Sequence, residues 1–226
     1  QVTELYEEKQ CYITKDAADP FGDSSSVALY EMENNANDSS GNGNNGTQSN
    51  VQFTTTDPIR GVYEASFNGS SSKIALPNVI NFATGEHTIS AWVNFTDTST
   101  SRFISNLYSG TVPNGSIDFV WIPSSNSINI DFSIGGSNYT NTITSVNSNE
   151  WIHIVSTFVN NGTCTAYKNG TSIDTVTAAS FTATTYQDLN LGYYARGNDY
   201  WSGSLDQVRI FDTALEGDQV FKLYAE

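Results

Sequence analysis

Residues 87–95, with the sequence HTISAWVNF, decide the fold class of this chain. Their apolar side chains alternate: Ile89, Ala91, Val93 and Phe95 share one face, and Trp92 points to the other. A period of two residues is typical of a β-strand whose two faces meet different surroundings. The sequence therefore predicts a strand here that packs one face into a core.

Similar short runs recur along the chain, with turn signals between them. The longest apolar run, Trp151–Val159, is expected at the centre of a sheet, and Asn169-Gly170 predicts a tight hairpin turn. Helix is expected only at the C-terminus, after an N-cap at Thr213. Many strands and almost no helix predict an all-β fold, a two-sheet antiparallel sandwich with a short C-terminal helix. The expected strands cover residues 27–32, 51–54, 62–67, 73–76, 87–95, 102–108, 116–122, 127–134, 151–159, 163–168, 189–193 and 204–211.

Composition argues against two kinds of partner. The 226 residues carry a formal net charge of −15 and only nine Lys and Arg residues, which are scattered. Binding to nucleic acid needs clustered basic side chains, so we expect no nucleic-acid partner. No run of about 18 apolar residues occurs, so we expect no membrane insertion.

The loop DSSGNGNNGT, residues 38–47, is rich in oxygen-bearing groups. Glycine and asparagine tolerate positive φ, so the loop should be tight and irregular. Hard cations such as Ca²⁺ need about six to eight oxygen ligands, and Asp38 with a distant partner, Asp206, would supply two carboxylates. Two other interpretations remain open: in one, Asp38 bonds its own loop backbone; in the other, Arg209 or backbone N–H groups satisfy Asp206.

The two ends of the chain resemble each other. Residues 1–8 read QVTELYEE and residues 219–226 read QVFKLYAE, with five of eight positions identical. A tandem array explains the match, with residues 1–26 as the end of a preceding module plus a linker and residues 27–226 as the domain. The two cysteines, Cys11 and Cys164, are compatible either with one disulfide or with two thiols.

A family resemblance rests on seven pieces in a fixed order: VALYEMENNANDSSGNGNNGT, ASFNGSSSKIAL, HTISAWVNF, WIHIVSTF, AYKNGTSI, LNLGYY and WSGSLDQVRIFDTAL. Together they resemble the laminin-G-like, concanavalin A-like jelly-roll family over residues 27–226. The resemblance implies a jelly roll of two curved antiparallel sheets. It also implies one structural Ca²⁺ held by Asp38, with Asn42 and Asn45 nearby, and by Asp206.

We expect no enzyme activity. Glycoside hydrolysis needs two carboxylates about 5 to 9 Å apart, but the candidate strands carry single acids such as Asp118 and Asp131. His87 and His153 lie in strands without a recognisable nucleophile motif and are expected to be structural.

The densest aromatic cluster outside an alternating strand runs from residue 193 to residue 201. Aromatic faces stack on sugar rings, while Arg, Asn and Asp supply directional hydrogen bonds. An alternative is that Tyr200 and Trp201 cover the hydrophobic edge of the sandwich. The predicted ligand-binding residues are Tyr194, Arg196, Asn198, Tyr200, Trp201 and Trp121.

These features predict a non-catalytic recognition or adhesion module, stabilised by Ca²⁺ and repeated in an adhesin or viral fibre. The expected partner is a cell-surface glycan or glycoprotein, or neighbouring copies of the module. The expected location is extracellular, on a cell surface or virion surface. The alternative is a structural subunit or spacer of a filament, stalk or virion coat without a glycan ligand.

Overall fold

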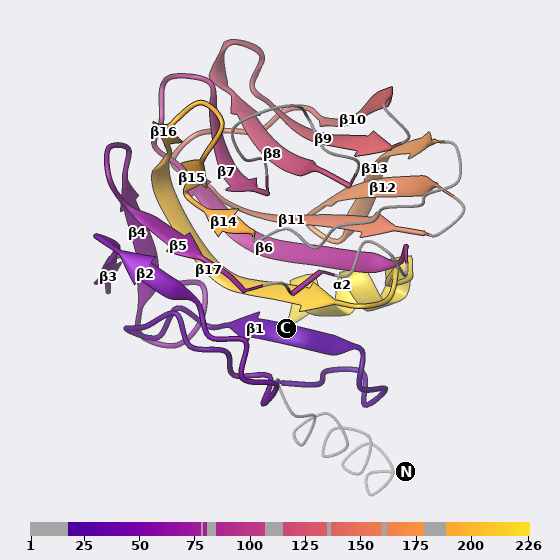
Figure 1. Cartoon of the computed structure of the whole chain (residues 1–226), viewed down its shortest axis with the longest axis horizontal. Helices are drawn as coiled ribbons and strands as arrows, with labels where there is room; N and C mark the ends of the chain where they lie inside the picture. The colour runs from indigo at the N-terminus through magenta and orange to yellow at the C-terminus, as the bar shows by residue number, and fades with distance from the viewer. Residues whose placement is uncertain are drawn as a thin grey trace, which may run out of the picture.

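Two antiparallel sheets pack face to face in the computed structural model, which describes residues 18–77, 79–80, 85–106, 115–134, 137–159, 162–178 and 189–226 (Figure 1). The larger sheet has the order β13-β12-β11-β6-β17-β4-β3, and β1 also pairs with β17. Its strands are β1 (Ser26–Tyr30), β3 (Gln52–Thr54), β4 (Glu64–Asn68), β6 (His87–Phe95), β11 (Trp151–Phe158), β12 (Thr163–Lys168), β13 (Thr171–Thr177) and β17 (Ser202–Phe211).

The second sheet has the order β10-β9-β8-β7-β14-β5-β2. Its strands are β2 (Thr47–Ser49), β5 (Lys73–Ala75), β7 (Ser101–Ser105), β8 (Ile117–Ile122), β9 (Ser127–Ile134), β10 (Ser137–Ile143) and β14 (Asn190–Leu191). A separate hairpin pairs β15 (Tyr193–Tyr194) with β16 (Asp199–Tyr200), a 3-10 turn covers Pro123–Ser125, and the helix α2 covers Gly217–Ala225. The predicted jelly-roll sandwich with a C-terminal helix is confirmed.

The strand that indicated the fold class lies inside the larger sheet. β6 pairs along its length with β11 and along its other edge with β17. Ile89, Ala91, Val93 and Phe95 are buried in the core, while Trp92 on the opposite face is half-buried. The expected alternation is therefore confirmed, and β11 lies between β6 and β12, as its apolar sequence predicts.

Several predicted boundaries were wrong, among them the run 189–193, which the structure divides between β14 and β15, and the two that follow. β1 ends at Tyr30 rather than at Met32, whose φ of 60° lies in the left-handed region. The N-cap of the C-terminal helix is Glu216, not Thr213, because Glu216 and Gln219 form a capping box that satisfies the first free N–H groups. The carbonyl of Thr213 instead accepts a hydrogen bond from the Thr88 hydroxyl.

Aromatic rings fill the space between the two sheets. The Phe95 ring lies 4.6 Å from Trp121 and 5.1 Å from Phe103, and Trp201 lies 5.8 Å from Phe103. These rings come from β6, β7, β8 and the residue just before β17, so they join both sheets. Large aromatic groups packed at these distances contribute strongly to core stability.

The outer face of the larger sheet is covered by α2 and by the loop of residues 55–63. Tyr224 of the helix stacks on Trp92 with ring centroids 5.6 Å apart. The indole N–H of Trp151 donates to the carbonyl of Asp57 in the loop, at 2.7 Å. This cover explains why several polar side chains of that face are buried.

Cys164 is a buried free thiol. It lies in β12 beside the hydroxyl of Ser156, and burial raises the pKa of the thiol to about 12. Cys11 lies outside the described residues. The contacts of Cys164 favour the interpretation with thiols over the one with a disulfide.

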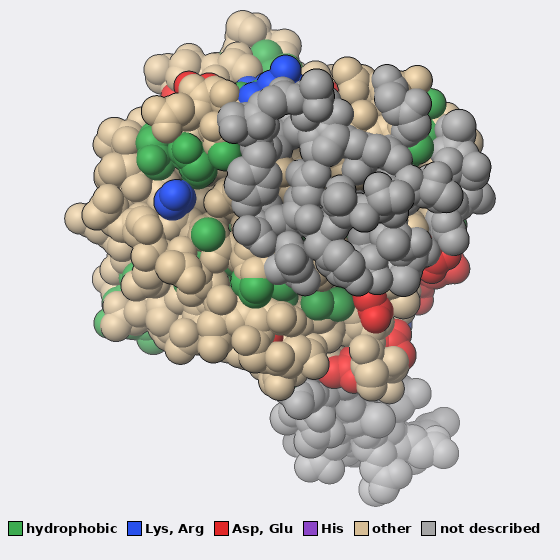
Figure 2. Space-filling view, viewed as in Figure 1, with side chains coloured by type: hydrophobic (Ala, Val, Ile, Leu, Met, Phe, Trp, Pro, Cys, Tyr) green, Lys and Arg blue, Asp and Glu red, His purple; other side chains and the backbone are tan. Residues whose placement is uncertain are grey.

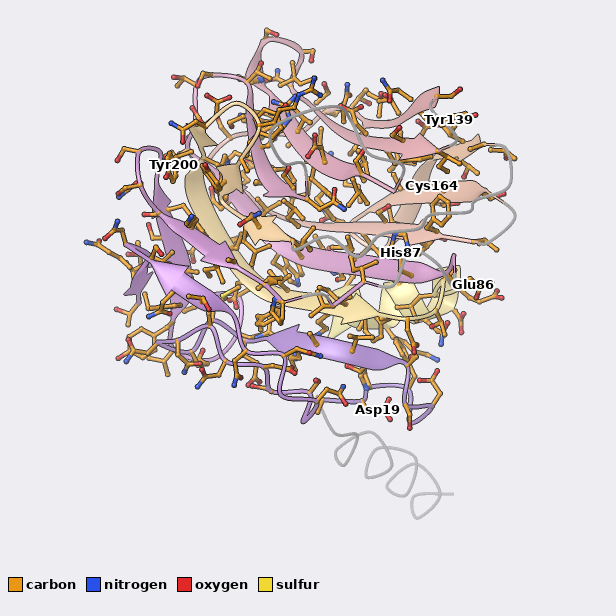
Figure 3. All side chains as sticks on the ribbon, in the orientation of Figure 1. Asp19, Glu86, His87, Tyr139, Cys164 and Tyr200 are labelled. Carbon is orange, nitrogen blue, oxygen red and sulfur yellow. The ribbon has the colours of Figure 1, made fainter. Side chains whose placement is uncertain are left out.

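His87 lies inside the sandwich, at the start of β6 and near Cys164 (Figure 3). Its ring stacks on Phe158 with centroids 5.2 Å apart. Burial lowers the pKa of His87 to about 3, so the folded protein keeps the ring neutral.

The variant His87→Phe should make the protein more resistant to acid. An unfolded histidine takes up a proton near pH 6.5, whereas folded His87 does so only near pH 3, so wild type loses stability as the pH falls through this window. The free energy of unfolding of wild type should fall relative to that of His87→Phe by up to about 1.4 kcal/mol per pH unit. Urea unfolding at several pH values between neutral and acid measures this difference. A difference that is constant with pH would contradict the buried neutral state.

Candidate functional site

The hairpin β15–β16 leaves the smaller sheet at a glycine. Gly192 has a φ of 73°, and a Cβ there would lie 2.1 Å from the ring of Phe67. Only glycine fits this turn without moving the core. The turn aims Tyr193 and Tyr200 at each other across the hairpin, with ring centroids 4.7 Å apart.

Two cations fix the hairpin against the smaller sheet. The Lys73 ammonium lies 4.8 Å from the centre of the Tyr193 ring, and the Arg102 guanidinium lies 3.9 Å from the centre of the Tyr194 ring. Arg102 Nε also donates to Asp118 Oδ2 at 3.3 Å. Two contacts thus link the hairpin to the outer face of the smaller sheet, one between Tyr194 and Arg102 and one between Arg102 and Asp118. Each contact restricts the side chains that it joins.

An open cleft of about 350 Å³ lies beside the hairpin. Hydroxyl, amide and carboxylate groups dominate its walls, and Tyr200 is the one aromatic side chain among them. Figure 2 shows apolar and basic side chains together over the part of the surface where Figure 1 draws β15 and β16. The lining residues are Gly69, Ser70, Ser99, Thr100, Ser101, Asn198, Asp199 and Tyr200.

Four of the predicted ligand-binding residues come together on this hairpin. Tyr194 and Tyr200 are half-buried, and Arg196 and Asn198 are exposed in the turn between them. Asn198 has a φ of 54° and accepts a hydrogen bond from the Tyr193 hydroxyl at 3.2 Å. Asn198 and Tyr200 also line the cleft.

The other two predicted ligand-binding residues belong to the core, which is a correction. Trp201 is 0% exposed and Trp121 is 1% exposed, so neither ring can meet a ligand. Trp201 follows Tyr200 in an extended segment, and successive side chains of such a segment point to opposite sides. The alternative prediction, that Trp201 covers the hydrophobic edge of the sandwich, is nearer to the observed position, although the ring lies inside the core.

Sequence reasoning missed several residues of this site. They lie on loops and strands more than 90 residues before the hairpin and are Ser70, Lys73, Thr100 and Arg102. No local signal marks them, because their role depends on the pairing of β7 with β14 and of β14 with β5.

Two acids lie opposite each other on the outer face of the smaller sheet. Asp118 of β8 pairs in register with Asp131 of β9, a cross-strand relation that spacing within one strand does not reveal. Burial raises the pKa of Asp118 to about 6, while Arg102 partly offsets this shift. Asp131 accepts a hydrogen bond from the Thr140 hydroxyl at 2.7 Å. These partners give the pair a structural role, and nothing in the contacts is evidence of catalysis.

A serine also lies beside a histidine. Ser90 Oγ and His153 Nε2 are 2.8 Å apart, although the sequence shows no serine motif near His153. Both residues are buried beneath the α2 side of the sheet, and burial lowers the pKa of His153 to about 3. A nucleophile needs access to substrate and a group that orients its base, and this pair lacks access.

The predicted calcium ligand Asp38 braces its own loop. Its carboxylate accepts backbone N–H groups from Leu29 at 3.0 Å, Ser40 at 2.8 Å and Asn44 at 2.9 Å. Burial alone would raise the pKa of Asp38, but the N–H groups of Leu29, Ser40 and Asn44 together hold it below its ordinary value. Two other predicted ligands join the same brace: Asn45 Oδ1 accepts from the Asp38 N–H, and Asn42 Nδ2 donates to the carbonyls of Ser26 and Val27.

Asp206 is fully buried in β17 and has a different set of donors. It accepts N–H groups from Ile59 at 2.8 Å, Arg60 at 3.1 Å and Gln207 at 2.8 Å. Burial raises the pKa of Asp206 to about 7 despite these bonds. Donors that surround both carboxylates do not fit one shared cation, and the described residues contain no cluster of three His, Cys, Asp or Glu suited to a metal. The calcium site predicted from the sequence is therefore untested, and the contacts favour the interpretations based on backbone bonding.

No helix in the described part of the chain is long and apolar enough to cross a membrane.

Solved structures share this architecture. Domain 4 of AbnA, a GH43 extracellular arabinanase from Geobacillus stearothermophilus, in complex with arabinotriose, matches with a TM-score of 0.72 and 23% identity over 88% of this chain and 98% of that chain. The binding domain of botulinum neurotoxin serotype D matches with a TM-score of 0.69 and 15% identity, over 89% of this chain and 50% of that chain. The botulinum neurotoxin DC binding domain in complex with rat synaptotagmin II has a TM-score of 0.67 and 18% identity, over 89% and 51%. This chain thus spans about half the length of the two toxin domains.

No curated protein matches the chain in sequence. A family model described as the concanavalin A-like lectin/glucanases superfamily does match, over residues 68–221. That range is more than half of the chain and includes most strands of both sheets as well as the hairpin β15–β16. The chain belongs to the concanavalin A-like lectin/glucanases superfamily.

Proposed function

We propose that this domain is a non-catalytic carbohydrate-binding module whose site is the cleft beside the hairpin β15–β16. The observation that carries the proposal is the position of Tyr200, a half-buried aromatic side chain at the wall of an open cleft of about 350 Å³ lined by hydroxyl and amide groups. A saccharide needs both kinds of surface, because its C–H faces pack on aromatic rings and its hydroxyls need directional partners.

Preorganisation of the hairpin supports the proposal. Lys73 and Arg102 hold the rings of Tyr193 and Tyr194, and the hydrogen bond from Tyr193 to Asn198 restrains the turn. A site that is already ordered loses less conformational entropy when a ligand binds. Asn198 and Asp199 then offer amide and carboxylate groups on the same wall as Tyr200.

Structural relatives give independent support at the level of ligand class. The arabinanase domain is in complex with arabinotriose, and a botulinum neurotoxin DC binding domain is in complex with SialylT. Their sequence identity to this chain is low, so they support a class of ligand and no particular sugar.

The finer proposal is a recognition or adhesion module of an extracellular, cell-surface or virion-surface protein. Its partner would be a surface glycan or glycoprotein. If several such modules follow one another in a chain, weak sites act together and raise the overall avidity.

The variant Tyr200→Ala should weaken glycan binding without unfolding the domain. The change removes a half-buried ring from the cleft wall, and we expect a loss of affinity of about tenfold or more. A glycan array with the wild-type chain identifies the ligand, and calorimetry with that ligand compares the variants.

Tyr139→Ala is the matched control, because Tyr139 is a half-buried tyrosine that stacks on Phe132, away from the hairpin. Its affinity should equal that of wild type. A wild-type chain that binds no glycan would remove the proposal and leave the structural role as a spacer or coat subunit.

The proposed function does not depend on calcium, which a separate measurement tests. Because backbone N–H groups already surround Asp38 and Asp206, we expect a chelator to leave the melting temperature of the chain unchanged. A clear fall of the melting temperature in chelator, absent in Asp38→Asn, would instead establish the calcium site.

A further inference from the structure

The helix α2 binds the outer face of the larger sheet through two buried apolar side chains. Val220 is 0% exposed and Leu223 is 4% exposed. They belong to a small cluster, separate from the main core, that also contains Val155, Tyr167, Phe211 and Leu215. We call the part of the domain that receives the helix the α2 surface, defined by these four residues together with Trp92, His153, Arg209 and Arg60.

Three further side chains of the C-terminal segment make specific contacts. Tyr224 stacks on Trp92 at 5.6 Å. Glu226 Oε2 lies 2.8 Å from Arg209 Nη2 and 3.5 Å from Arg60 Nη1. Gln219 Oε1 accepts the backbone N–H of Glu216 and so completes the capping box at the start of the helix.

The remaining side chains of this segment face solvent. Phe221 is 55% exposed, although its ring lies 6.4 Å from that of Tyr224 in the same helix; the Lys222 side chain is 56% exposed, and Ala225 is exposed. Within the described part of the chain, Lys222 forms an ion pair with Asp218 of the same helix, at 3.6 Å, and such an exposed pair contributes little.

The sequence match between the two ends of the chain separates the contacting positions of the C-terminal segment from its exposed positions. Residues 1–8 are identical to residues 219–226 at the positions of Gln219, Val220, Leu223, Tyr224 and Glu226, which all make contacts. They differ at the positions of Phe221, Lys222 and Ala225, which all face solvent. The α2 surface accounts for four of these five positions, because Gln219 bonds Glu216 of its own helix.

We propose that the α2 surface recognises the sequence Val-x-x-Leu-Tyr-x-Glu, and that residues 1–8 dock on the α2 surface of a second copy of this domain. Each chain has one α2 surface and two segments that carry this sequence. In this structure the chain's own helix covers the surface, so residues 1–8 of one copy bind a second copy by displacing its helix α2. Residues 1–8 lie outside the described part of the chain, and the proposal uses only their sequence.

Charge gives the docking its specificity. Arg209 is 4% exposed, and a buried guanidinium without a carboxylate partner is costly. Burial lowers the pKa of Arg209, and Glu226 partly offsets this shift. A segment that replaces α2 must bring an acid to this place, and Glu8 occupies the position of Glu226.

Peptide binding to the full chain tests the proposal. The double variant Leu5→Asp/Leu223→Asp weakens both the chain's own helix and its own N-terminal segment, which frees the α2 surface. A peptide of residues 1–8 should then shift the NMR signal of the Trp92 indole N–H at about 1 mM peptide. The same peptide with Leu5→Asp should bind about tenfold more weakly or worse, whereas a peptide with Glu4→Ala, altered at a position that faces solvent in α2, should bind equally.

Association of the full chain gives the second readout. Leu223→Asp should form dimers or larger species by light scattering, since residues 1–8 of one copy dock on the freed surface of another, and adding Leu5→Asp should return it to a monomer. Lys222→Asp is the matched control in α2 and should stay monomeric. If circular dichroism shows that Leu223→Asp is unfolded, Tyr224→Ala, which removes only the stack on Trp92, replaces it in both experiments. Equal binding of the unchanged and Leu5→Asp peptides, or no binding of either, overturns the proposal.

Discussion

The pairing of β17 holds the domain together, because this late strand joins segments from the whole length of the chain. One edge of β17 pairs with β6, and the other edge pairs first with β4 and then with β1. The partner changes near Asp206, where the pairing with β6 also has an irregularity and Gln207 takes a φ of 48°. Without further hydrogen-bond donors, the Asp206 carboxylate would be buried without partners at this break, and backbone groups beside it would be unpaired.

The carboxylate of Asp206 forms the hydrogen bonds that stabilise the chain at this break. Its oxygens accept N–H groups from Ile59, Arg60 and Gln207, so the loop of residues 55–63 is fixed at the point where β17 changes partner. The same loop carries Arg60, which shares Glu226 with Arg209. One side chain thus connects the sheet, its covering loop and, through Arg60, the end of the C-terminal helix.

The two candidate binding surfaces lie on different sheets and have different character. The cleft beside β15–β16 is open and polar and is reached from loops at the edge of the smaller sheet. The α2 surface is apolar with a buried basic group and belongs to the outer face of the larger sheet. The two proposed surfaces share no residues, so the two proposals are independent of each other.

The sequence alone determined the fold class, since period-two alternation in runs such as residues 87–95 has one simple solution, a strand with a buried face. It also singled out aromatic and polar residues between Tyr194 and Tyr200, which are neighbours in the chain, but it did not predict that they form a hairpin. Only the tertiary structure decided that Trp121 and Trp201 belong to the core, that Asp118 faces Asp131, and that Arg102 supports Tyr194. These relations join residues far apart in the chain, and they depend on strand order and register, which local sequence patterns do not contain.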